Sequence, residues 1–409
     1  MRSTLSRALL VALVSLGAGG VASARQAASA PAAPSTKWVQ VQSRSGEWTR
    51  TPAAEFRLES FAKLDAIAIR FESDEARGRA ARAADAIELQ LGAGEWIRAR
   101  LVSAQGEGLR VELGAGAPLE LSIDDVLSIT APGRLAGVEV SPAASGDRLY
   151  WLRPKGVDRV DGAFQEFADG GVVFESALGV KTFPWSEVGA LVIEPLSAPA
   201  AVASAGARVE VDLAPAGRLR AELVSIDAGR VRLRWRAGRE LELALDRVEQ
   251  LVLDDGSVGH LGALAPARVV EGWPAGDDSG MRWPFQVDRS VVGGPLRAGG
   301  RVWPRGIGVH APSRIEWELD GSWKRLLGSV AIDDSVELLA YRGSVRCAVY
   351  LDGAEAPIWR SGRIEGGGAP VPLGEIDLSG VRRVALEVDM DERLYVADRL
   401  NWLDLRLVR

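Results

Sequence analysis

The chain has 409 residues, enough for two or three domains, and its 47% hydrophobic and 25% charged residues are typical of a folded globular protein. The net charge of -6 excludes the large basic surface of a typical nucleic-acid-binding protein. One cysteine, Cys347, excludes an intramolecular disulfide, and two histidines leave too few ligands for an ordinary zinc site.

Residues 1–24 have the pattern of a signal peptide. Arg2 and Arg7 precede a short apolar segment, 8–16, and an A-x-A cleavage motif follows. The apolar segment is shorter than the roughly 20 residues that a spanning helix needs, and no later segment is apolar enough to span a membrane. We therefore expect an exported protein, periplasmic or extracellular, with a flexible leader at 25–37 and no membrane span after signal cleavage. An uncleaved anchor is the alternative.

Three segments in the middle of the chain resemble one another, with a period of about 60 residues. The motif A-x-L-V-S occurs at 99–103 and again at 221–225, and both copies continue with alternating apolar and polar residues between glycine turns. This pattern resembles that of SH3-like or Sm-like barrels, which are small antiparallel β-barrels. It predicts β-barrel repeats at 87–130, 148–194 and 208–256.

The segments that flank the repeats are simpler. We expect a partial β unit with a linker at 38–86 and a linker of small residues at 195–207. The resemblance to SH3-like barrels implies either a protein partner at the repeats or a spacer role. Asp124, Asp125 and Asp246 precede the last strand of a repeat, where we expect them to cap a turn rather than to act in catalysis.

The last part of the chain, 268–409, predicts an antiparallel β-sandwich. Segments such as 345–351 and 384–388 alternate apolar and polar residues, and Asp352-Gly353 is a hairpin signal. Five motifs follow in order: R-G-I-G-V-H-A at 305–311, V-A-I-D-D at 330–334, G-S-V at 343–345, W-R-S-G at 359–362 and A-D-R-L-N-W-L-D at 397–404.

In this order the motifs resemble the NPCBM family, a carbohydrate-binding module found attached to glycoside hydrolases such as those of family 98. The resemblance covers residues 268–409. It implies a galactose-binding-like jelly roll that holds a glycan without cleaving it, sometimes with a structural calcium ion. Arg399, Leu400 and Asn401 stand where the family has His, Ala and Asp. These departures leave the sugar preference open.

The candidate binding residues combine aromatic rings, which pack on the apolar face of a sugar, with groups that hydrogen-bond to hydroxyls. They are His310, Asp333, Asp334, Trp359, Asp398, Asn401 and Trp402. Core packing is slightly favoured for Trp402, and a structural role and a ligand contact are equally open for His310. The Asp333-Asp334 pair could bind sugar, bind calcium or cap a turn. Asp398 and Asn401 are the candidates whose polar side chains are hardest to explain by packing alone.

No catalytic residue is predicted. No segment has a glycosidase signature, and neither His260 nor His310 lies near a G-x-S-x-G motif. The sequence therefore predicts an all-β, non-catalytic, exported carbohydrate-binding protein whose partner is a glycan, with no nucleic-acid partner and no cofactor other than the calcium ion left open above. Two alternatives remain: a structural or interaction protein of the cell envelope without sugar affinity, and an accessory subunit of a glycoside hydrolase.

Overall fold

The computed structural model describes twelve stretches of the chain: 36–58, 65–73, 86–92, 94–113, 118–135, 137–168, 170–194, 206–214, 217–227, 229–272, 283–391 and 396–409. The predicted signal peptide at 1–24, most of the leader and most of the linker at 195–207 lie outside the described residues. Within these stretches the structure consists of strands and single 3-10 turns, which confirms the predicted all-β class. No helix in these stretches is long and apolar enough to cross a membrane.

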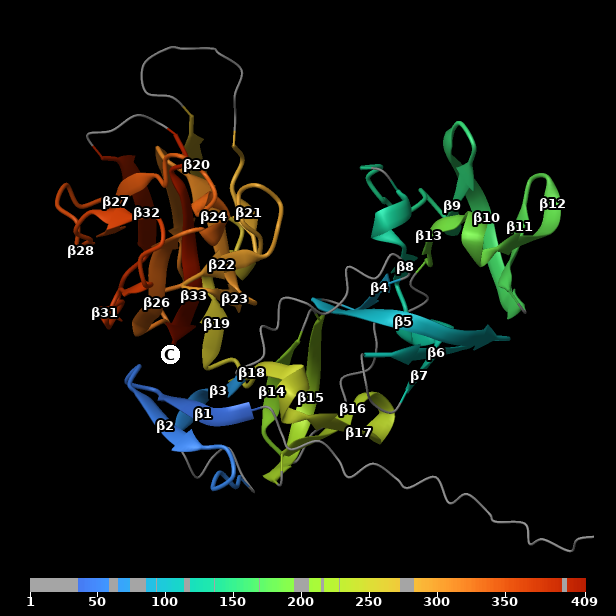
Figure 1. The fold of residues 1–409 in the computed structure, drawn as a ribbon, viewed down its shortest axis with the longest axis horizontal. Coiled ribbons are helices and arrows are strands. Elements are labelled where there is room, and N and C mark those ends of the chain that lie inside the picture. The colour runs from blue at the N-terminus through green and yellow to red at the C-terminus, as the bar shows by residue number, and fades with distance from the viewer. Residues whose placement is uncertain are drawn as a thin grey trace, which may run out of the picture. The chain divides into compact units, whose positions relative to one another are not determined.

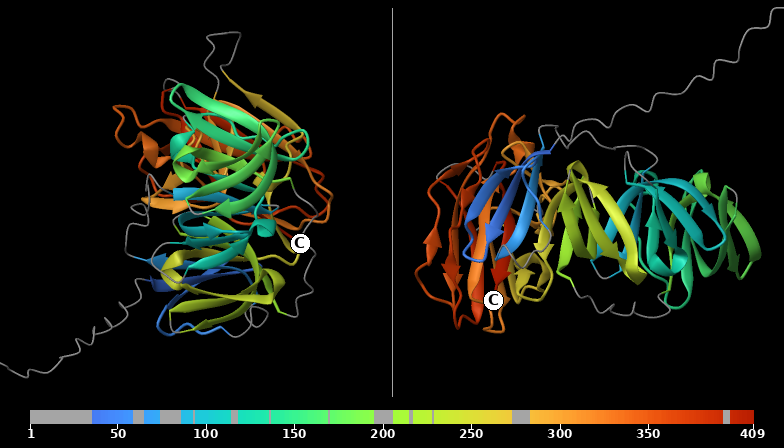
Figure 2. Two further views of the ribbon diagram at one scale, coloured as in Figure 1. Left: turned by 90° about the vertical axis from the view of Figure 1, so that its right-hand side faces the viewer. Right: turned by 90° about the horizontal axis from the view of Figure 1, so that it is seen from below.

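In each of the three repeats, four strands pair in chain order as an antiparallel meander and the fifth strand pairs with the first, as in a small β-barrel (Figures 1 and 2). Repeat 1 contains β4 (Ala86–Gly92), β5 (Glu95–Gln105), β6 (Gly108–Glu112), β7 (Leu119–Ser122) and β8 (Ser128–Thr130). Repeat 2 contains β9 (Asp147–Arg153), β10 (Gly156–Ala168), β11 (Gly171–Ser176), β12 (Gly179–Pro184) and β13 (Val188–Val192). Repeat 3 contains β14 (Arg208–Leu213), β15 (Gly217–Asp227), β16 (Arg230–Trp235), β17 (Arg239–Ala244) and β18 (Val248–Leu253).

A single 3-10 turn precedes the last strand of every repeat. The turns are η2 (Ile123–Asp125), η4 (Trp185–Glu187) and η6 (Leu245–Arg247); η3 (Pro132–Arg134) and η5 (Arg236–Gly238) lie elsewhere. In all three, a valine N–H closes the turn by bonding to the carbonyl three residues earlier. In repeat 1 the Asp125 carboxylate accepts the Ser122 N–H at 3.2 Å, so this aspartate caps a turn as expected.

The repeats are joined to one another through strand edges. Strand β13 of repeat 2 pairs with β8 of repeat 1, and β15 of repeat 3 pairs with β5 of repeat 1. The predicted partial β unit at 38–86 contains β1 (Thr36–Ser43), β2 (Trp48–Pro52) and β3 (Ala66–Ser73). Strand β3 pairs with β18, so this unit extends the sheet of repeat 3.

The C-terminal part is a sandwich of two antiparallel sheets. The first sheet contains β19 (Val258–His260), β21 (Gln286–Val287), β24 (Gly306–His310), β26 (Arg325–Ile332), β30 (Val371–Pro372), β31 (Ile376–Asp377) and β33 (Arg399–Val408). The second contains β20 (Arg268–Glu271), β25 (Ser313–Glu318), β27 (Ser344–Leu351), β28 (Trp359–Arg360), β29 (Ile364–Glu365) and β32 (Arg383–Met390). A separate hairpin, β22 (Leu296–Ala298) and β23 (Arg301–Trp303), completes this part with the turns η7 (Leu261–Ala263) and η8 (Asp334–Val336).

Strand β33 is buried on both of its faces. Its inward side chains, including Leu400, Trp402 and Leu407, lie in the core between the two sheets. Its outward side chains are also covered. Leu403 packs with the β22–β23 hairpin, and Val408 packs with a residue of β3. The first sheet also takes in β19, which lies before the predicted start of this part at residue 268; the predicted domain boundaries themselves remain predictions.

We predict that Gly162→Ala destabilises repeat 2. A Cβ at this position would meet the Glu175 carbonyl oxygen across the β10–β11 pair, and two paired backbones cannot separate without losing ladder hydrogen bonds. We expect a loss of about 1–3 kcal/mol in unfolding free energy, measured by urea denaturation. Gly294→Ala is the control, because its Cβ would meet nothing within 4 Å. Equal stability of the two variants would mean that β10 and β11 do not approach each other this closely at Gly162.

Candidate functional site

One end of the sandwich is formed by the connections that enter or leave β24, β26, β27, β32 and β33. We call it the loop end; its described residues are 283, 310–312, 333–343, 391 and 396–399. It lies where β33 begins, whereas β19 pairs with the other end of that strand. Two backbone contacts tie its loops together: the Ala311 N–H donates to the Asp398 carbonyl at 3.0 Å, and the Asp333 N–H donates to the Arg399 carbonyl at 2.8 Å.

His310 lies at this end, beneath a tryptophan. The indole of Trp283 stacks on the imidazole with ring centres 5.6 Å apart and planes 16° apart. Nδ1 of His310 lies 2.8 Å from the Ala311 carbonyl oxygen, which can only accept, so this nitrogen carries the proton. Burial lowers the pKa of His310, with a smaller effect from the Arg399 charge. A neutral, stacked imidazole therefore forms part of the floor of the loop end.

Asp398 is buried, and its backbone carbonyl accepts the N–H of Ala311. One carboxylate oxygen accepts the Ser344 N–H at 2.8 Å, and the other is buried with no hydrogen-bond partner among the described residues. Burial raises the pKa of Asp398 to about 6, although the Ser344 hydrogen bond lowers it, and the Asp391 charge raises it further. A carboxyl group in this state is available to donate or to accept, depending on pH.

Asp333, Asp334 and Asn401 are brought together, and they hold the β22–β23 hairpin. The Asn401 amide donates to Asp333 at 2.6 Å and to the Arg297 carbonyl at 3.2 Å, while Asp333 accepts the Arg297 N–H at 3.1 Å. Asp334 accepts two glycine N–H groups in the hairpin turn. Asp333 also caps η8 by accepting the N–H of Ser335. Turn capping, one of the three expected roles of the aspartate pair, is therefore present.

The two predicted tryptophans differ in burial. Trp402 is 1% exposed and packs in the core, the alternative that the sequence slightly favoured. Trp359 is half-buried on β28, which pairs with β27 opposite Val349, and it packs on the edge of the same core. The contacts place Trp359 on the second sheet, in a different element from the loop end. Of the seven predicted residues, only Trp359 and Asp334 are not fully buried.

The sequence patterns did not indicate the residues that project most at the loop end. Leu338 is 97% exposed and Tyr341 is 70% exposed, and Val396 is exposed on the neighbouring loop. Their loops are adjacent, because a Cβ at Gly343 would touch the backbone of Ala397. A signal was available: Leu338-Leu339-Ala340-Tyr341 is an apolar run outside any alternating strand.

Polar groups lie below this projecting surface. Arg399 is half-buried and donates to the Ser335 hydroxyl at 3.3 Å. It occupies the position where the resemblance expected His. Among the described residues, no group of three or more His, Cys, Asp or Glu side chains is placed to hold a metal ion.

The comparisons with known proteins concern mainly this sandwich. The model of the NPCBM/NEW2 domain matches residues 271–408. Alpha-1,3-galactosidase B of Akkermansia muciniphila is 34% identical over 127 residues, which are 29% of this chain but only 15% of that enzyme. The family that the motifs indicated is thus confirmed for residues 271–408.

Two solved structures illustrate the likeness. A CBM51 module from Clostridium perfringens, in complex with methyl-galactose, is 22% identical with a TM-score of 0.32, covering 37% of this chain and 99% of that one. Tandem CBM51 modules of a family 98 glycoside hydrolase from Streptococcus pneumoniae are 13% identical with a TM-score of 0.31, covering 90% of this chain and 88% of that one.

We predict that Trp402→Ala lowers the unfolding free energy by about 3–5 kcal/mol, because it leaves a large cavity in the sandwich core. Trp359→Ala, at the half-buried edge, is the matched control and should cost less. Urea denaturation followed by circular dichroism measures both. An unchanged midpoint for Trp402→Ala would mean that this indole does not pack as described.

We predict that Asp398 makes the sandwich less stable as pH rises from about 4 to about 6. In that range the folded state keeps a proton that the unfolded chain has lost, so raising the pH favours unfolding. The unfolding free energy of the wild type minus that of Asp398→Asn should therefore fall between pH 4 and pH 7. A difference that is flat or rising would contradict the raised pKa.

Proposed function

We propose that this protein is an exported, non-catalytic glycan-binding protein that takes its ligand at the loop end. The observation that carries the proposal is an exposed aromatic ring, Tyr341, on the end of a sandwich whose family consists of carbohydrate-binding modules. A sugar ring has an apolar C–H face and a rim of hydroxyls, so its site needs an aromatic surface with hydrogen-bonding groups around it.

The loop end offers both kinds of group. Tyr341 and Trp283 supply ring surface, and Arg399 supplies donors in a fixed planar arrangement. Asp333 and Asn401, by contrast, are already occupied in holding the β22–β23 hairpin. We therefore assign ligand contact to the projecting residues, with His310 and Asp398 as the polar floor beneath them.

We do not propose hydrolysis. A glycosidase places two carboxyl groups on opposite sides of the bond that it cleaves. At the loop end, Asp333 and Asp398 are buried and bonded to backbone N–H groups. The similarity to a short segment of a galactosidase favours a terminal galactoside as the first ligand to test. Export rests on the pattern at residues 1–24 alone.

A glycan array with the full chain tests the proposal. We expect binding to at least one glycan, and about a tenfold loss of affinity for Tyr341→Ala with unchanged thermal stability. Leu178→Ala is the control: this side chain is 95% exposed in repeat 2, so its loss should leave binding intact.

The other outcomes decide between the alternatives. Binding to no glycan would overturn the proposal and favour an envelope protein without sugar affinity. Binding that survives Tyr341→Ala and Trp283→Ala but is lost in Trp359→Ala would move the site to the second sheet. Recovery of the chain in a complex with a glycoside hydrolase would favour the accessory-subunit alternative.

A further inference from the structure

The sandwich and the barrel sheet meet across a buried polar surface, which we call the joint. Strands β1–β3 lie beside β33 in the right-hand view of Figure 2, and Ile67 of β3 packs with Leu327 and Val408 of the sandwich. Around this apolar contact the side chains are charged. Arg70 of β3 pairs with Asp404 of β33 at 3.0 Å, and both side chains are 8% exposed.

Further arginines at the joint also have partners across it. Arg406 of β33 donates to Gln42 of β1 and, at 3.0 Å, to Gln250 of β18. Arg305, just before β24, donates to Glu210 of β14. In the opposite direction, Arg218 of β15 reaches Asp288 at 3.0 Å and the Pro304 carbonyl at 3.1 Å. These arginines and Arg70 face four carboxylates, those of Glu210, Asp212, Asp288 and Asp404.

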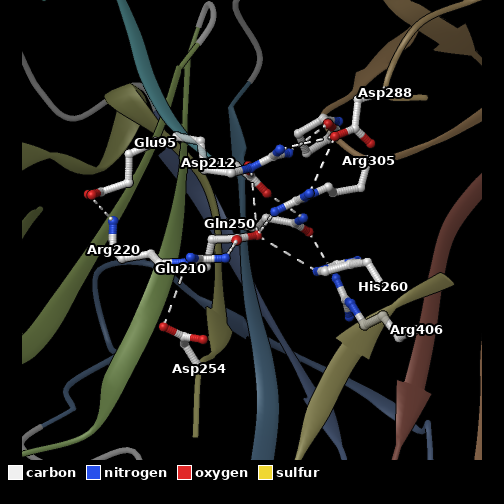
Figure 3. Close-up of polar contacts among 12 residues, drawn as sticks. Glu95, Glu210, Asp212, Arg220, Gln250, Asp254, His260, Asp288, Arg305 and Arg406 are labelled. Carbon is white, nitrogen blue, oxygen red and sulfur yellow. Dashed lines mark hydrogen bonds and ion pairs between the residues drawn. The ribbon is translucent and has the colours of Figure 1, made fainter. Parts of the chain in front are cut away.

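His260 lies beside Arg406 in Figure 3, where a dashed line joins it to Glu210. Its side chain is 12% exposed, and both ring nitrogens are buried without a hydrogen-bond partner among the described residues. The carboxylate that it approaches is that of Glu210, with Nε2 3.8 Å from Oε1, and Glu210 also pairs with Arg305, Arg218 and Arg220.

The groups that face His260 come from every packed element. Those that act on His260 directly are Glu210 of β14, Arg218 and Arg220 of β15, Arg305 before β24 and Arg406 of β33. Their own partners are Asp212 of β14, Gln250 of β18, Asp288 before β24 and Asp404 of β33. Burial and the charges of Arg305, Arg406, Arg218 and Arg220 together hold the pKa of His260 well below its ordinary value.

We propose that the joint is a proton-sensitive switch: with His260 neutral it holds the barrel sheet against β33, and protonation of His260 opens it. The reason is charge balance. The carboxylates of the joint are already paired with arginines, so a proton on His260 adds one uncompensated charge to a buried site, which costs more than the same proton in water. Opening exposes the imidazole and removes that cost. The switch is independent of the proposed glycan binding.

The direction of the pH effect follows from linkage. In the open state His260 titrates near its ordinary pKa of about 6.5, whereas the closed state stays unprotonated to lower pH. Below about pH 6.5 the open state therefore binds more protons, and the closed state is disfavoured by up to about tenfold per pH unit.

Asp212, a carboxylate of the joint, acts in a lower pH range. The pKa of Asp212 is lowered by Arg218 and Arg305, despite the opposing effect of burial. Such a group stabilises the closed state above its ordinary pKa of about 4 and loses that effect only below it. Between pH 7.5 and 5, the titration of Asp212 therefore does not contribute to the effect assigned to His260.

Hydrogen–deuterium exchange of the full chain at pH 7.5 and pH 5, corrected for intrinsic rates, tests the switch. We expect the amides of β1, β19 and the end of β33 to lose protection at pH 5, while β27 and β32 inside the sandwich keep theirs. His260→Gln should remove the pH difference, and His260→Arg, permanently charged, should open the joint at both values.

His310→Gln is the matched control, because His310 is the other histidine of the chain and is not among the groups that face His260. It should keep the pH response of the joint. Two results would overturn the proposal: equal protection of the wild-type joint at pH 7.5 and pH 5, or the same loss of protection in His260→Gln. If His260→Arg does not fold, the His260→Gln comparison still decides the question.

Discussion

Most of this architecture depends on the need to cover β33 on both faces. An ordinary sandwich strand has one face in the core and one in water, so it alternates apolar and polar side chains. Here the outward face carries Leu403, Arg406 and Val408, all of them buried. Two separate elements cover it, the β22–β23 hairpin at one end and the barrel sheet at the other. Because a buried arginine must be hydrogen-bonded, Arg406 depends on Gln42 and Gln250 of the barrel sheet for its partners while this face is covered.

This covering also limits where a ligand can bind. The β22–β23 hairpin and β3 pack on the outer face of the first sheet, so the surface that they cover is not accessible to a sugar. The polar groups of Asp333 and Asn401 could hydrogen-bond to a glycan, but they already make the hydrogen bonds that hold the β22–β23 hairpin. The loop end, by contrast, is exposed, with Tyr341 and Leu338 projecting from it.

Sequence periodicity was sufficient for the strand content and the barrel repeats, whereas the family of the C-terminal part was indicated by the resemblance of its ordered motifs. The landmark before the last strand of each repeat was visible because a turn of fixed geometry needs residues at fixed spacing. The site was harder to predict. Asp333, Asp398 and Asn401 stand out as polar residues in an apolar context, yet their partners include backbone groups that no pattern reveals. The joint was missed because its pairs are far apart in the chain: Arg70 and Asp404 are 334 residues apart.

The pairing of the repeats through their edges has a consequence for the number of repeats. Strand β8 closes its own barrel against β4 and also pairs with β13 of the next repeat, so it has no free edge there. If repeat 2 were deleted, the N–H and C=O groups of β8 would face solvent as an unprotected edge, which is a template for association with other chains. Loss of repeat 2 would therefore leave repeat 1 with an exposed strand edge, which the tandem of repeats avoids.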